Sequence, residues 1–531
     1  MPENLYYERG RQFLSWRELL NSHARMIGQP TFKPSKRWYQ FRRWFKPDEA
    51  LIMRRPEGPS FYWGGFLLPW SEATTHFLVL GATGSGKSLL FLNLMEGVLP
   101  QLNKLPDHRA FIYDAKCELL PRLIAMGLNP MIFDPYDERS VGWDLAADIR
   151  TPAEAQQLAK SMVPSVEDGK DSFWINSTRI VLAAVVESFA FFAPGRWTLR
   201  DVLLTMRSPD RITDLLDRRP ETAHVWKNCQ GDEKTRLNLL ASFTSHLQRF
   251  EVVAALFEKA KVKFSLLKWV KESGGILLVP NHPRYRATLG PIHRLLFDRI
   301  TDEVLELPNS DQRRTFFLLD EIRSLGRVEN LFHLSNEGRS KGVCLVVGSQ
   351  SIEGIHQVYG EKLGNEILGQ LRGKTFLRTD SHTTASWIES HIGQVQYLVE
   401  QISHSTGYSD GKTNRSTSVS HSRRRESLIF GSEIMKMATP KPGGVFNLVN
   451  DLPSLGGCFV TTYGFEQLIG GLTPPKPGVA AFVERDVQHQ VLREWTAKDF
   501  KRLKFPAALA APPAADLEVA ELFTKIETSQ P

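Results

Sequence analysis

Short apolar runs that end in a polar or acidic residue recur along the chain. His76–Leu80 leads directly into a glycine-rich loop, and both Ala110–Asp114 and Met131–Asp134 end in an aspartate. Strands buried on both faces of a parallel sheet read as continuous apolar stretches, and their carboxyl ends carry functional groups. The pattern therefore predicts a doubly wound, mostly parallel α/β sheet with Asp114 and Asp134 at its carboxyl edge. Further runs of this kind lie at 275–279, 316–321 and 343–350.

A helical pattern replaces the strand pattern between residues 150 and 272. Apolar residues recur at helical spacing there, as in 175–192, which predicts an all-α domain inserted into the sheet domain. The most apolar stretch, Ile180–Ala193, is interrupted by Glu187 and Ser188 and is followed by proline and glycine. We expect a buried helix there rather than a membrane span.

The remaining segments differ in composition from these two domains. Ser403–Ser427 is rich in Ser, Thr and Gly and predicts a flexible surface loop. The Pro- and Ala-rich sequence after 471 predicts a largely disordered tail with one short helix at 516–526. The predicted domains are an amino-terminal adapter without transmembrane helices (1–72), the sheet domain (73–149 and 273–470), the inserted all-α domain (150–272) and the tail (471–531).

Composition narrows the class of protein only slightly. The 531 residues are 42% hydrophobic and 24% charged, which is usual for a multidomain soluble protein. The net charge of +7 is compatible with a polyanionic partner. The four cysteines form no CxxC pair, which argues against a zinc knuckle or disulfide framework and suits a reducing cytoplasm. Since no stretch approaches the roughly 20 apolar residues of a membrane span, we expect a cytoplasmic protein.

The glycine-rich loop carries the strongest chemical signal in the sequence. Residues 81–88 satisfy G-x-x-x-x-G-K-[ST], between an apolar run and a helical pattern. In such a loop the glycines let backbone N–H groups surround phosphates, Lys87 reaches the β- and γ-phosphates, and the Ser88 hydroxyl coordinates Mg²⁺. A glycine-rich turn without a ligand is the alternative. The predicted nucleotide-binding residues are Gly81, Ala82, Thr83, Gly84, Ser85, Gly86, Lys87, Ser88 and Leu89.

Two later strands supply the other expected site residues. The apolar run Phe316–Leu319 is followed by Asp320, expected to hold Mg²⁺ through water, and Glu321, expected to orient or deprotonate the attacking water. Gln350 ends the next strand and could contact the γ-phosphate or its water. Arg339, between these strands, could reach a neighbouring subunit's nucleotide. Ordinary strand ends and a surface arginine are the alternatives.

The order of these motifs resembles the TraG/TraD-like type IV secretion coupling proteins, conjugative DNA-transfer ATPases of the FtsK/HerA motor superfamily. The resemblance covers roughly residues 60–470. Besides the loop, it rests on WGGFLLPWSEATTHF before it and on the motifs at 114–119, 133–135, 139–144, 173–176, 319–321, 338–340 and 348–350.

The resemblance implies a RecA-like P-loop NTPase domain with a helical insertion, assembled as a homo-hexameric ring. Such a ring would use ATP with Mg²⁺ to pass DNA, single-stranded and relaxase-bound, to a type IV secretion channel, with the insertion facing the substrate. By position, Lys87 and Ser88 take the Walker A roles and Asp320 and Glu321 the Walker B roles. Arg339 is the finger acting in trans, and Gln350 is the sensor.

The sequence departs from the family pattern in two places. Ala115 and Cys117 replace the usual proline and glycine of the segment that holds Asp114, Lys116 and Glu118. From the sequence we also expect no membrane anchor of the kind that most members carry at the amino terminus. Either a partner tethers the protein peripherally at the inner membrane, or it works in solution; the basic, aromatic Ser35–Lys46 would suit anionic headgroups, or is a solvated packed segment.

Two other functions remain open from the sequence. One is a soluble HerA-like motor for DNA processing, packaging or defence, which genomic neighbourhood would separate from a coupling protein. The other is a nucleotide-gated adapter with little turnover. The complete Asp320-Glu321 pair argues against the adapter, because a pure switch has less need of a water-activating glutamate.

Overall fold

The computed structural model describes residues 5–10, 14, 16–26, 58–102, 107–164, 172–409, 412–486 and 492–504. The chain divides into two compact units. The first comprises 1–115, 119–129 and 304–479, and the second comprises 116–118, 130–303 and 480–531. Ser35–Lys46 and the helix predicted at 516–526 lie outside the described residues.

The first unit contains a mostly parallel sheet, which confirms the predicted α/β fold. Its strands run in the order β16-β15-β12-β4-β11-β10-β5, and the central strands are buried along their whole length. The parallel strands are β4 (Phe77–Leu80), β5 (His108–Asp114), β10 (Arg314–Leu319), β11 (Val343–Ser349) and β12 (Gly373–Phe376); β15 (Val445–Leu452) and β16 (Gly457–Gly464) are antiparallel.

The register of these strands decides which loops meet. Leu80 of β4 pairs with Ser349 of β11, and Leu319 of β10 pairs with Val347 of β11. The carboxyl ends of three neighbouring strands therefore lie at one edge of the sheet. The glycine-rich loop, Asp320 and Gln350 follow these ends directly.

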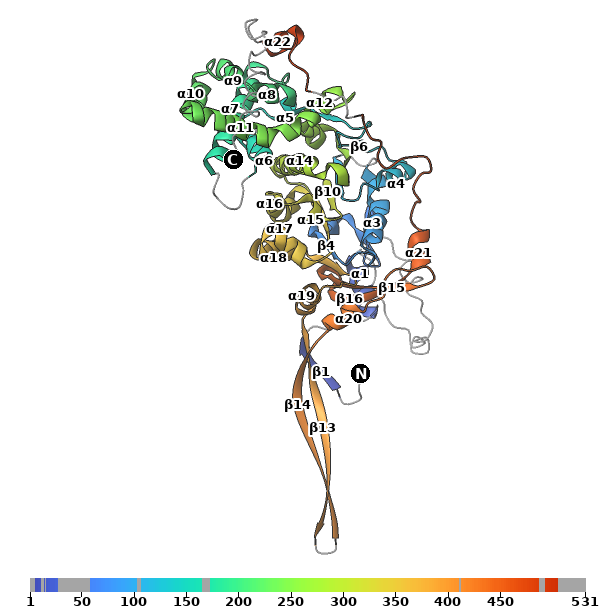
Figure 1. Cartoon of the computed structure of the whole chain (residues 1–531). Helices are drawn as coiled ribbons and strands as arrows, with labels where there is room; N and C mark the ends of the chain where they lie inside the picture. The colour runs from blue at the N-terminus through green and yellow to red at the C-terminus, as the bar shows by residue number, and fades with distance from the viewer. Residues whose placement is uncertain are drawn as a thin grey trace, which may run out of the picture. The chain divides into compact units, whose positions relative to one another are not determined.

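Helices flank the sheet of the first unit, and α17 and α18 pack on each other beside α16 (Figure 1). The short hairpin β2 (Ser60–Trp63) and β3 (Phe66–Pro69) places Trp63 with its ring centroid 4.5 Å from that of Phe77. Residues 58–72, assigned to the adapter from sequence, thus belong to this unit. Its helices are α1 (Trp16–Met26), α3 (Lys87–Leu102), α4 (Leu120–Ala125), α15 (Ile322–Leu325), α16 (Leu331–Glu337), α17 (Ile352–Tyr359), α18 (Glu361–Gln370), α19 (His382–Ile392), α20 (Gly431–Met435) and α21 (Phe465–Gly470), with the turns η2 (Trp70–Thr75), η6 (Gly338–Lys341) and η7 (Pro453–Leu455).

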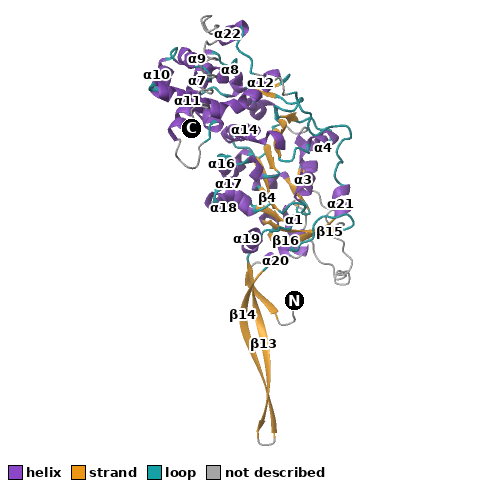
Figure 2. Ribbon diagram, viewed as in Figure 1, coloured by secondary structure: helices purple, strands orange, loops and turns teal. Residues whose placement is uncertain are grey.

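A long β-hairpin occupies the segment that the sequence predicted to be a flexible loop. β13 (Gln394–Ser409) and β14 (Lys412–Ser427) pair in unbroken antiparallel register, and β1 (Leu5–Gly10) joins the other edge of β13. The ribbon extends away from α19 and α20 (Figures 1 and 2). The loop prediction was wrong because antiparallel pairing joins backbone groups, which the polar composition of Ser403–Ser427 does not reveal.

The second unit is largely helical, as Figure 2 shows by its colours. Two short parallel pairs accompany the helices, β6 (Met131–Ile132) with β9 (Gly275–Pro280) and β7 (Gly142–Trp143) with β8 (Lys263–Phe264). The helices are α5 (Leu145–Asp148), α6 (Pro152–Met162), α7 (Ser172–Phe192), α8 (Leu199–Met206), α9 (Pro209–Leu216), α10 (Pro220–Gln230), α11 (Glu233–Leu247), α12 (Glu251–Lys259), α13 (Leu266–Lys268) and α14 (Arg286–Glu306), with short turns η3 (Gln248–Phe250), η4 (Trp269–Ser273) and η5 (Pro283–Tyr285).

Helix α7 is the centre of this helical unit. It packs against α6, α8, α9, α10 and α11. Within the described residues, one stretch, Phe173–Phe192, is long and apolar enough to span a membrane, so the expectation that no stretch approaches this length was wrong. Of its apolar window, 61% is buried inside the protein. The buried helix expected at Ile180–Ala193 is therefore observed.

Part of the predicted disordered tail is ordered in the second unit. Ala480–Asp486 runs beside 136–139, where Glu138 N donates to Val483 O at 2.9 Å. Leu492–Lys504 follows and contains α22 (Ala497–Leu503). The prediction of disorder was wrong for these residues, because polar contacts from distant parts of the chain hold them. Residues 505–531 lie outside the described part of the chain.

Candidate functional site: a phosphate-binding loop and two strand ends

The glycine-rich loop is tied to both neighbouring strands of the sheet. Gly81 N donates to Ser349 O at 3.2 Å, and Ala82 N donates to Arg378 O at 2.9 Å. The first contact joins the loop to the end of β11, and the second joins it to the segment after β12. Two backbone hydrogen bonds therefore fix the first residues of the loop at the carboxyl edge of the sheet.

Three glycines make the loop conformation possible. A Cβ on Gly81 would lie 2.7 Å from the Leu377 Cβ, well inside contact distance. Gly84 and Gly86 have φ values of 77° and 105°, which residues with a side chain rarely adopt. A loop with this freedom can turn its N–H groups toward one ligand.

Helix α3 starts at Lys87, at the end of the loop. Leu90 N donates to Gly86 O at 3.2 Å, so the helical hydrogen bonds begin immediately after the glycines. The first N–H groups of a helix have no partners within it, and they carry the positive end of the helix dipole. The loop and the start of α3 together have the geometry of a phosphate-binding site.

Lys87 connects the loop with the end of β10. Its Nζ lies 3.1 Å from Asp320 O and 2.9 Å from Glu321 Oε2. The side chains of Lys87 and Glu321 are only 9% and 15% exposed. The ion pair is thus largely shielded from water, where charge interactions are stronger than at the surface.

Asp320 offers a carboxylate oxygen without a protein partner. Among the described residues, Asp320 Oδ1 is buried and accepts no hydrogen bond, and Ser85 Oγ of the loop is buried without a partner as well. Burying a carboxylate oxygen is costly unless it is paired or binds a cation. Its oxygen, with the hydroxyl of Ser88, is the donor type that Mg²⁺ prefers, so these residues fit the expected metal ion.

Gln350 lies beside the loop. Thr83 Oγ1 donates to Gln350 Oε1 at 3.3 Å. Gly348, two residues earlier, approaches the end of β10 so closely that an added Cβ would lie 2.9 Å from the Asp320 carbonyl carbon. The structure thus brings Thr83, Lys87, Asp320 and Gln350 to one edge of the sheet.

Arg339 does not join this group. It lies in η6, before the amino end of β11, whereas Gln350 follows the carboxyl end of the same strand. A seven-residue strand spans about 20 Å, so the two residues lie at opposite edges of the sheet. Burial, with the charges of Arg339 and Arg372, lowers the pKa of His76 to about 4, which puts Arg339 near the start of β4.

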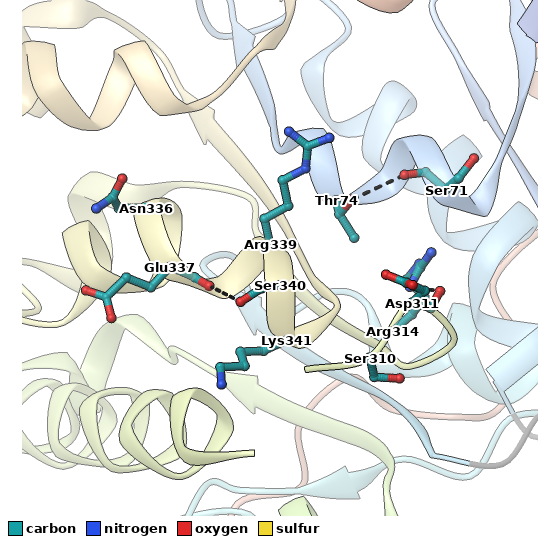
Figure 3. Close-up of a pocket in the computed structure, with 10 residues that line it drawn as sticks. All are labelled: Ser71, Thr74, Ser310, Asp311, Arg314, Asn336, Glu337, Arg339, Ser340 and Lys341. Carbon is teal, nitrogen blue, oxygen red and sulfur yellow. Dashed lines mark hydrogen bonds between the residues drawn. The ribbon is translucent and has the colours of Figure 1, made fainter. Parts of the chain in front are cut away.

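Arg339 lines a cavity of about 800 Å³. Figure 3 shows Arg339 and Lys341 leaving η6 in different directions. Ser340 Oγ donates back to Glu337 O at 3.2 Å, which holds the turn that presents both cations. The lining residues are Ser71, Thr74, Ser310, Asp311, Arg314, Asn336, Glu337, Arg339, Ser340 and Lys341.

Asp114 contacts the backbone of the turn that leads into α4. It is buried, and its Oδ2 accepts a hydrogen bond from Leu119 N at 2.8 Å, just before α4. Lys116 and Glu118 are more than half exposed, with 3.8 Å between Nζ and Oε1. The expected position at the carboxyl edge is observed, and the contact of Asp114 stabilises the turn into α4.

Strand β12 supports the loop, although its sequence does not predict a strand. Its four residues are buried, and they place Leu377 against Gly81 and the carbonyl of Arg378 against Ala82. The apolar signal is short, because only Thr375, Phe376 and Leu377 stand between Lys374 and Arg378. A strand of four residues gives too little pattern to be found in advance.

A strand, a phosphate-binding loop and a helix, with an acidic pair at the end of a neighbouring parallel strand, define the class of P-loop nucleoside triphosphatases. A family model described as "Type IV secretion-system coupling protein DNA-binding domain" matches residues 61–456. The chain belongs to this family.

Individual relatives are distant. The coupling protein TraD of Escherichia coli (strain K12) is 22% identical over 457 residues, which are 84% of this chain and 58% of TraD. The chain thus spans less than two thirds of that relative. The conjugative coupling protein TrwBdeltaN70, in its unbound form, superposes with a TM-score of 0.63 at 22% identity, over 82% of this chain and 93% of that one. TrwB in complex with the ATP analogue ADPNP gives 0.64 at 20% identity, over 90% and 98%.

Proposed function

We propose that the protein is an ATP-driven DNA translocase that acts as a coupling protein, linking relaxase-bound DNA to a type IV secretion channel. The observation that carries the nucleotide part is the position of Lys87, between the loop and both acids that follow β10. Membership of the coupling-protein family supports the DNA part.

The loop and the start of α3 would hold the nucleotide through its phosphates. Lys87 would contact the β- and γ-phosphates, and Asp320 with Ser88 would hold Mg²⁺. Mg²⁺ bound there supplies positive charge to the phosphate oxygens. TrwB has been solved with ADPNP and with ADP and Mg²⁺, which supports ATP with Mg²⁺ as the ligand of this related fold.

Glu321 is the proposed base. Its carboxylate would accept a proton from the water that attacks the γ-phosphorus, while Gln350 orients that water or contacts the γ-phosphate. Because Glu321 Oε2 lies 2.9 Å from Lys87 Nζ, the lysine holds this carboxylate at the phosphate end of the site. When Lys87 turns toward phosphate oxygens, the carboxylate becomes free to accept a proton.

Arg339 would complete the site of a neighbouring subunit. It lies at the edge of the sheet opposite its own loop, within a cavity that Arg314 and Lys341 also line. Such a concentration of cations suits the negative charge that develops on a transferred phosphoryl group. This arrangement supports a homo-hexameric ring, with DNA in its central channel.

The remaining partners follow from the same proposal. The helical second unit would face the relaxase-bound, single-stranded DNA, and channel proteins would receive it. Partners would also bring the protein to the inner membrane, as a peripheral component. The excess of 66 basic over 59 acidic residues is compatible with a polyanionic substrate.

An ATPase assay with and without single- or double-stranded DNA tests the proposal, run beside a measurement of molecular mass. We expect DNA to raise both the turnover and the fraction of assembled protein. Nucleotide binding without turnover, with or without DNA, would instead identify a nucleotide-gated adapter. Turnover that DNA does not change would contradict the translocase.

A further inference from the structure

A short carboxyl-terminal segment, Glu494–Leu503, covers part of the helical unit. Phe500 and Leu503 are buried, and Leu503 is fully shielded from solvent. The ring centroid of Phe500 lies 5.7 Å from that of Trp495 in an edge-on contact. The segment therefore has its own apolar anchor on this surface.

The centre of the contact is Asp201 of α8, whose side chain has no exposed area. Trp495 Nε1 donates to Asp201 Oδ1 at 2.8 Å. Arg502 donates to both carboxylate oxygens of Asp201, at 2.8 and 2.9 Å. A buried carboxylate needs such partners, and two of them come from a segment about 300 residues away in the chain.

Two arginines surround this acid. Arg200 Nη2 lies 2.6 Å from Asp499 Oδ1, and Arg211 Nη2 lies 2.8 Å from Glu494 Oε2. The guanidinium of Arg211 also lies 4.9 Å from the centroid of the Trp495 ring. The surface thus matches one sequence pattern. The indole of Trp495 and the guanidinium of Arg502 contact the buried carboxylate of Asp201. Two acidic residues of the segment pair with the arginines on either side of it.

The segment does not use every donor that the surface offers. Among the described residues, Arg200 Nε and Trp197 Nε1 are buried without an acceptor. Trp197 and its neighbours Arg196 and Thr198 line a cavity of about 140 Å³. Unmet buried donors are costly, and the segment does not satisfy every polar group around Asp201.

We propose that this surface, formed by Arg196, Trp197, Arg200, Asp201 and Arg211, is a docking site for a helix of a partner protein. The segment Glu494–Leu503 occupies it in cis and must leave before the partner binds. By analogy with Trp495 and Arg502, the partner would carry an aromatic residue just before the helix and an arginine within it, with acidic residues beside them. The site is separate from the nucleotide chemistry and does not depend on it.

Nucleic acid fits this surface poorly. The buried carboxylate of Asp201 at its centre would repel phosphate, and the segment meets it with cationic and N–H groups. The arginines around it are matched by carboxylates, in the arrangement of a protein interface. A protein helix is therefore the partner that the charges favour.

The test uses full-length protein and a fluorescein-labelled peptide of residues 492–504. In wild type the cis segment should exclude the peptide, because a tethered segment competes at an effective concentration on the order of millimolar. The variant Trp495→Ala with Arg502→Ala should release the site and bind the peptide about 100-fold more tightly than wild type. Adding Asp201→Asn to that variant should abolish the binding.

Matched controls keep the result specific. Lys501→Ala changes an exposed residue of the same helix and should exclude the peptide as wild type does. A peptide carrying both alanine replacements should not bind, and a single-stranded oligonucleotide should not displace the normal peptide. Arg502→Ala alone should show the same effect with a smaller change in affinity.

Several outcomes would overturn the proposal. Equal peptide binding by wild type and the released variant would show that the segment does not cover the site. Binding that survives Asp201→Asn, or that DNA displaces, would assign a different surface or ligand. If both released variants lose the wild-type thermal transition, the segment is a permanent part of the fold and no docking site exists.

Discussion

Lys87 Nζ lies 2.9 Å from Glu321 Oε2, so the side chain expected to bind phosphate already contacts the side chain expected to activate water. An ammonium group has three N–H donors, and Asp320 O accepts another of them at 3.1 Å. Any phosphate that Lys87 binds must share the ammonium with these two acceptors or replace one. Nucleotide binding is therefore coupled to the position of Glu321.

Replacing Lys87 by alanine should abolish ATP turnover while the fold survives. The variant loses the charge at the phosphates and leaves Glu321, only 15% exposed, without its cation. Steady-state ATP hydrolysis measures the effect, and the thermal transition reports folding. Lys362→Ala, an exposed lysine on α18, is the matched control and should keep wild-type activity. A turnover rate near that of wild type in the Lys87 variant would show that Lys87 is not needed for ATP hydrolysis.

Replacing Glu321 by glutamine should slow hydrolysis about 10²- to 10⁴-fold, as loss of a general base does. The amide keeps the shape of the side chain but cannot take a proton from water. Nucleotide affinity, measured with a fluorescent ATP analogue, should remain close to wild type. Glu366→Gln on the exposed face of α18 should change neither quantity. Lost affinity with unchanged turnover would refute the assignment.

Arg339→Ala should be inactive alone but active in mixtures with Lys87→Ala. In a mixed assembly some interfaces hold an intact Lys87 and an intact Arg339 on opposite sides. Arginines that act in trans are worth about 10³- to 10⁵-fold in rate, so even a few restored interfaces should give measurable turnover. If mixed assemblies form without recovering activity, Arg339 acts within its own subunit or supports the fold, and Arg372 and Arg378 become the next candidates.

The first unit should lose stability below about pH 6.5 because of His76. Burial, first of all, and then the charges of Arg339 and Arg372 lower its pKa from 6.5 to about 4. Between these values the unfolded chain binds a proton that the folded chain does not. Stability therefore falls as the pH drops through this window, by about 1.4 kcal/mol at pH 5.5.

Urea unfolding of wild type and His76→Asn between pH 7.5 and 5 measures this contribution. The side-chain oxygen of asparagine can still accept the hydrogen bond that Leu345 N donates to His76 Nδ1 at 3.3 Å. The variant should lose less stability on acidification. His382→Gln changes an exposed histidine and should keep the wild-type pH dependence. Identical profiles for wild type and His76→Asn would exclude His76 as the source.

Gly81→Ala should weaken nucleotide binding and destabilise the first unit. The new methyl group would lie 2.7 Å from the Leu377 Cβ, and overpacking of this kind costs roughly 1–3 kcal/mol. Gly369→Ala provides the control. It places a methyl group in open space on a helix, where alanine stabilises by about 0.5–1 kcal/mol. A Gly81 variant that binds ATP and melts like wild type would show that the loop can move away from β12.

The site could be predicted from sequence because its parts are local. The loop at 81–88 and the Asp320-Glu321 pair each follow a continuous apolar strand, so the chemistry is attached to a visible structural signal. Their meeting at one edge follows from the parallel order of the strands. Arg339 lies away from the loop of its own chain because it precedes the amino end of β11.

The failed predictions concern structure held by distant or backbone contacts. The hairpin at 394–427 depends on backbone pairing and carries many serines and arginines, so its sequence shows little of the apolar periodicity that predicts a strand. The segment Glu494–Leu503 depends on Asp201, which local sequence does not connect with it. In both cases the stabilising contacts are not visible in the hydrophobic periodicity of a short stretch of sequence.

The opposite positions of the glycine-rich loop and Arg339 restrict how copies of this chain can share a site. A two-fold symmetric dimer joins one surface to itself, so it pairs an arginine with a loop only where a single surface holds both. Because Arg339 and the loop lie at opposite edges of the sheet, a heterologous contact, in which one surface meets a different one, is the arrangement that joins each arginine to the loop of the next copy. Repeated, such contacts close into a ring or continue as a helical filament. Every copy then has the same orientation, and the assembly has two different faces from which a polymer could enter or leave.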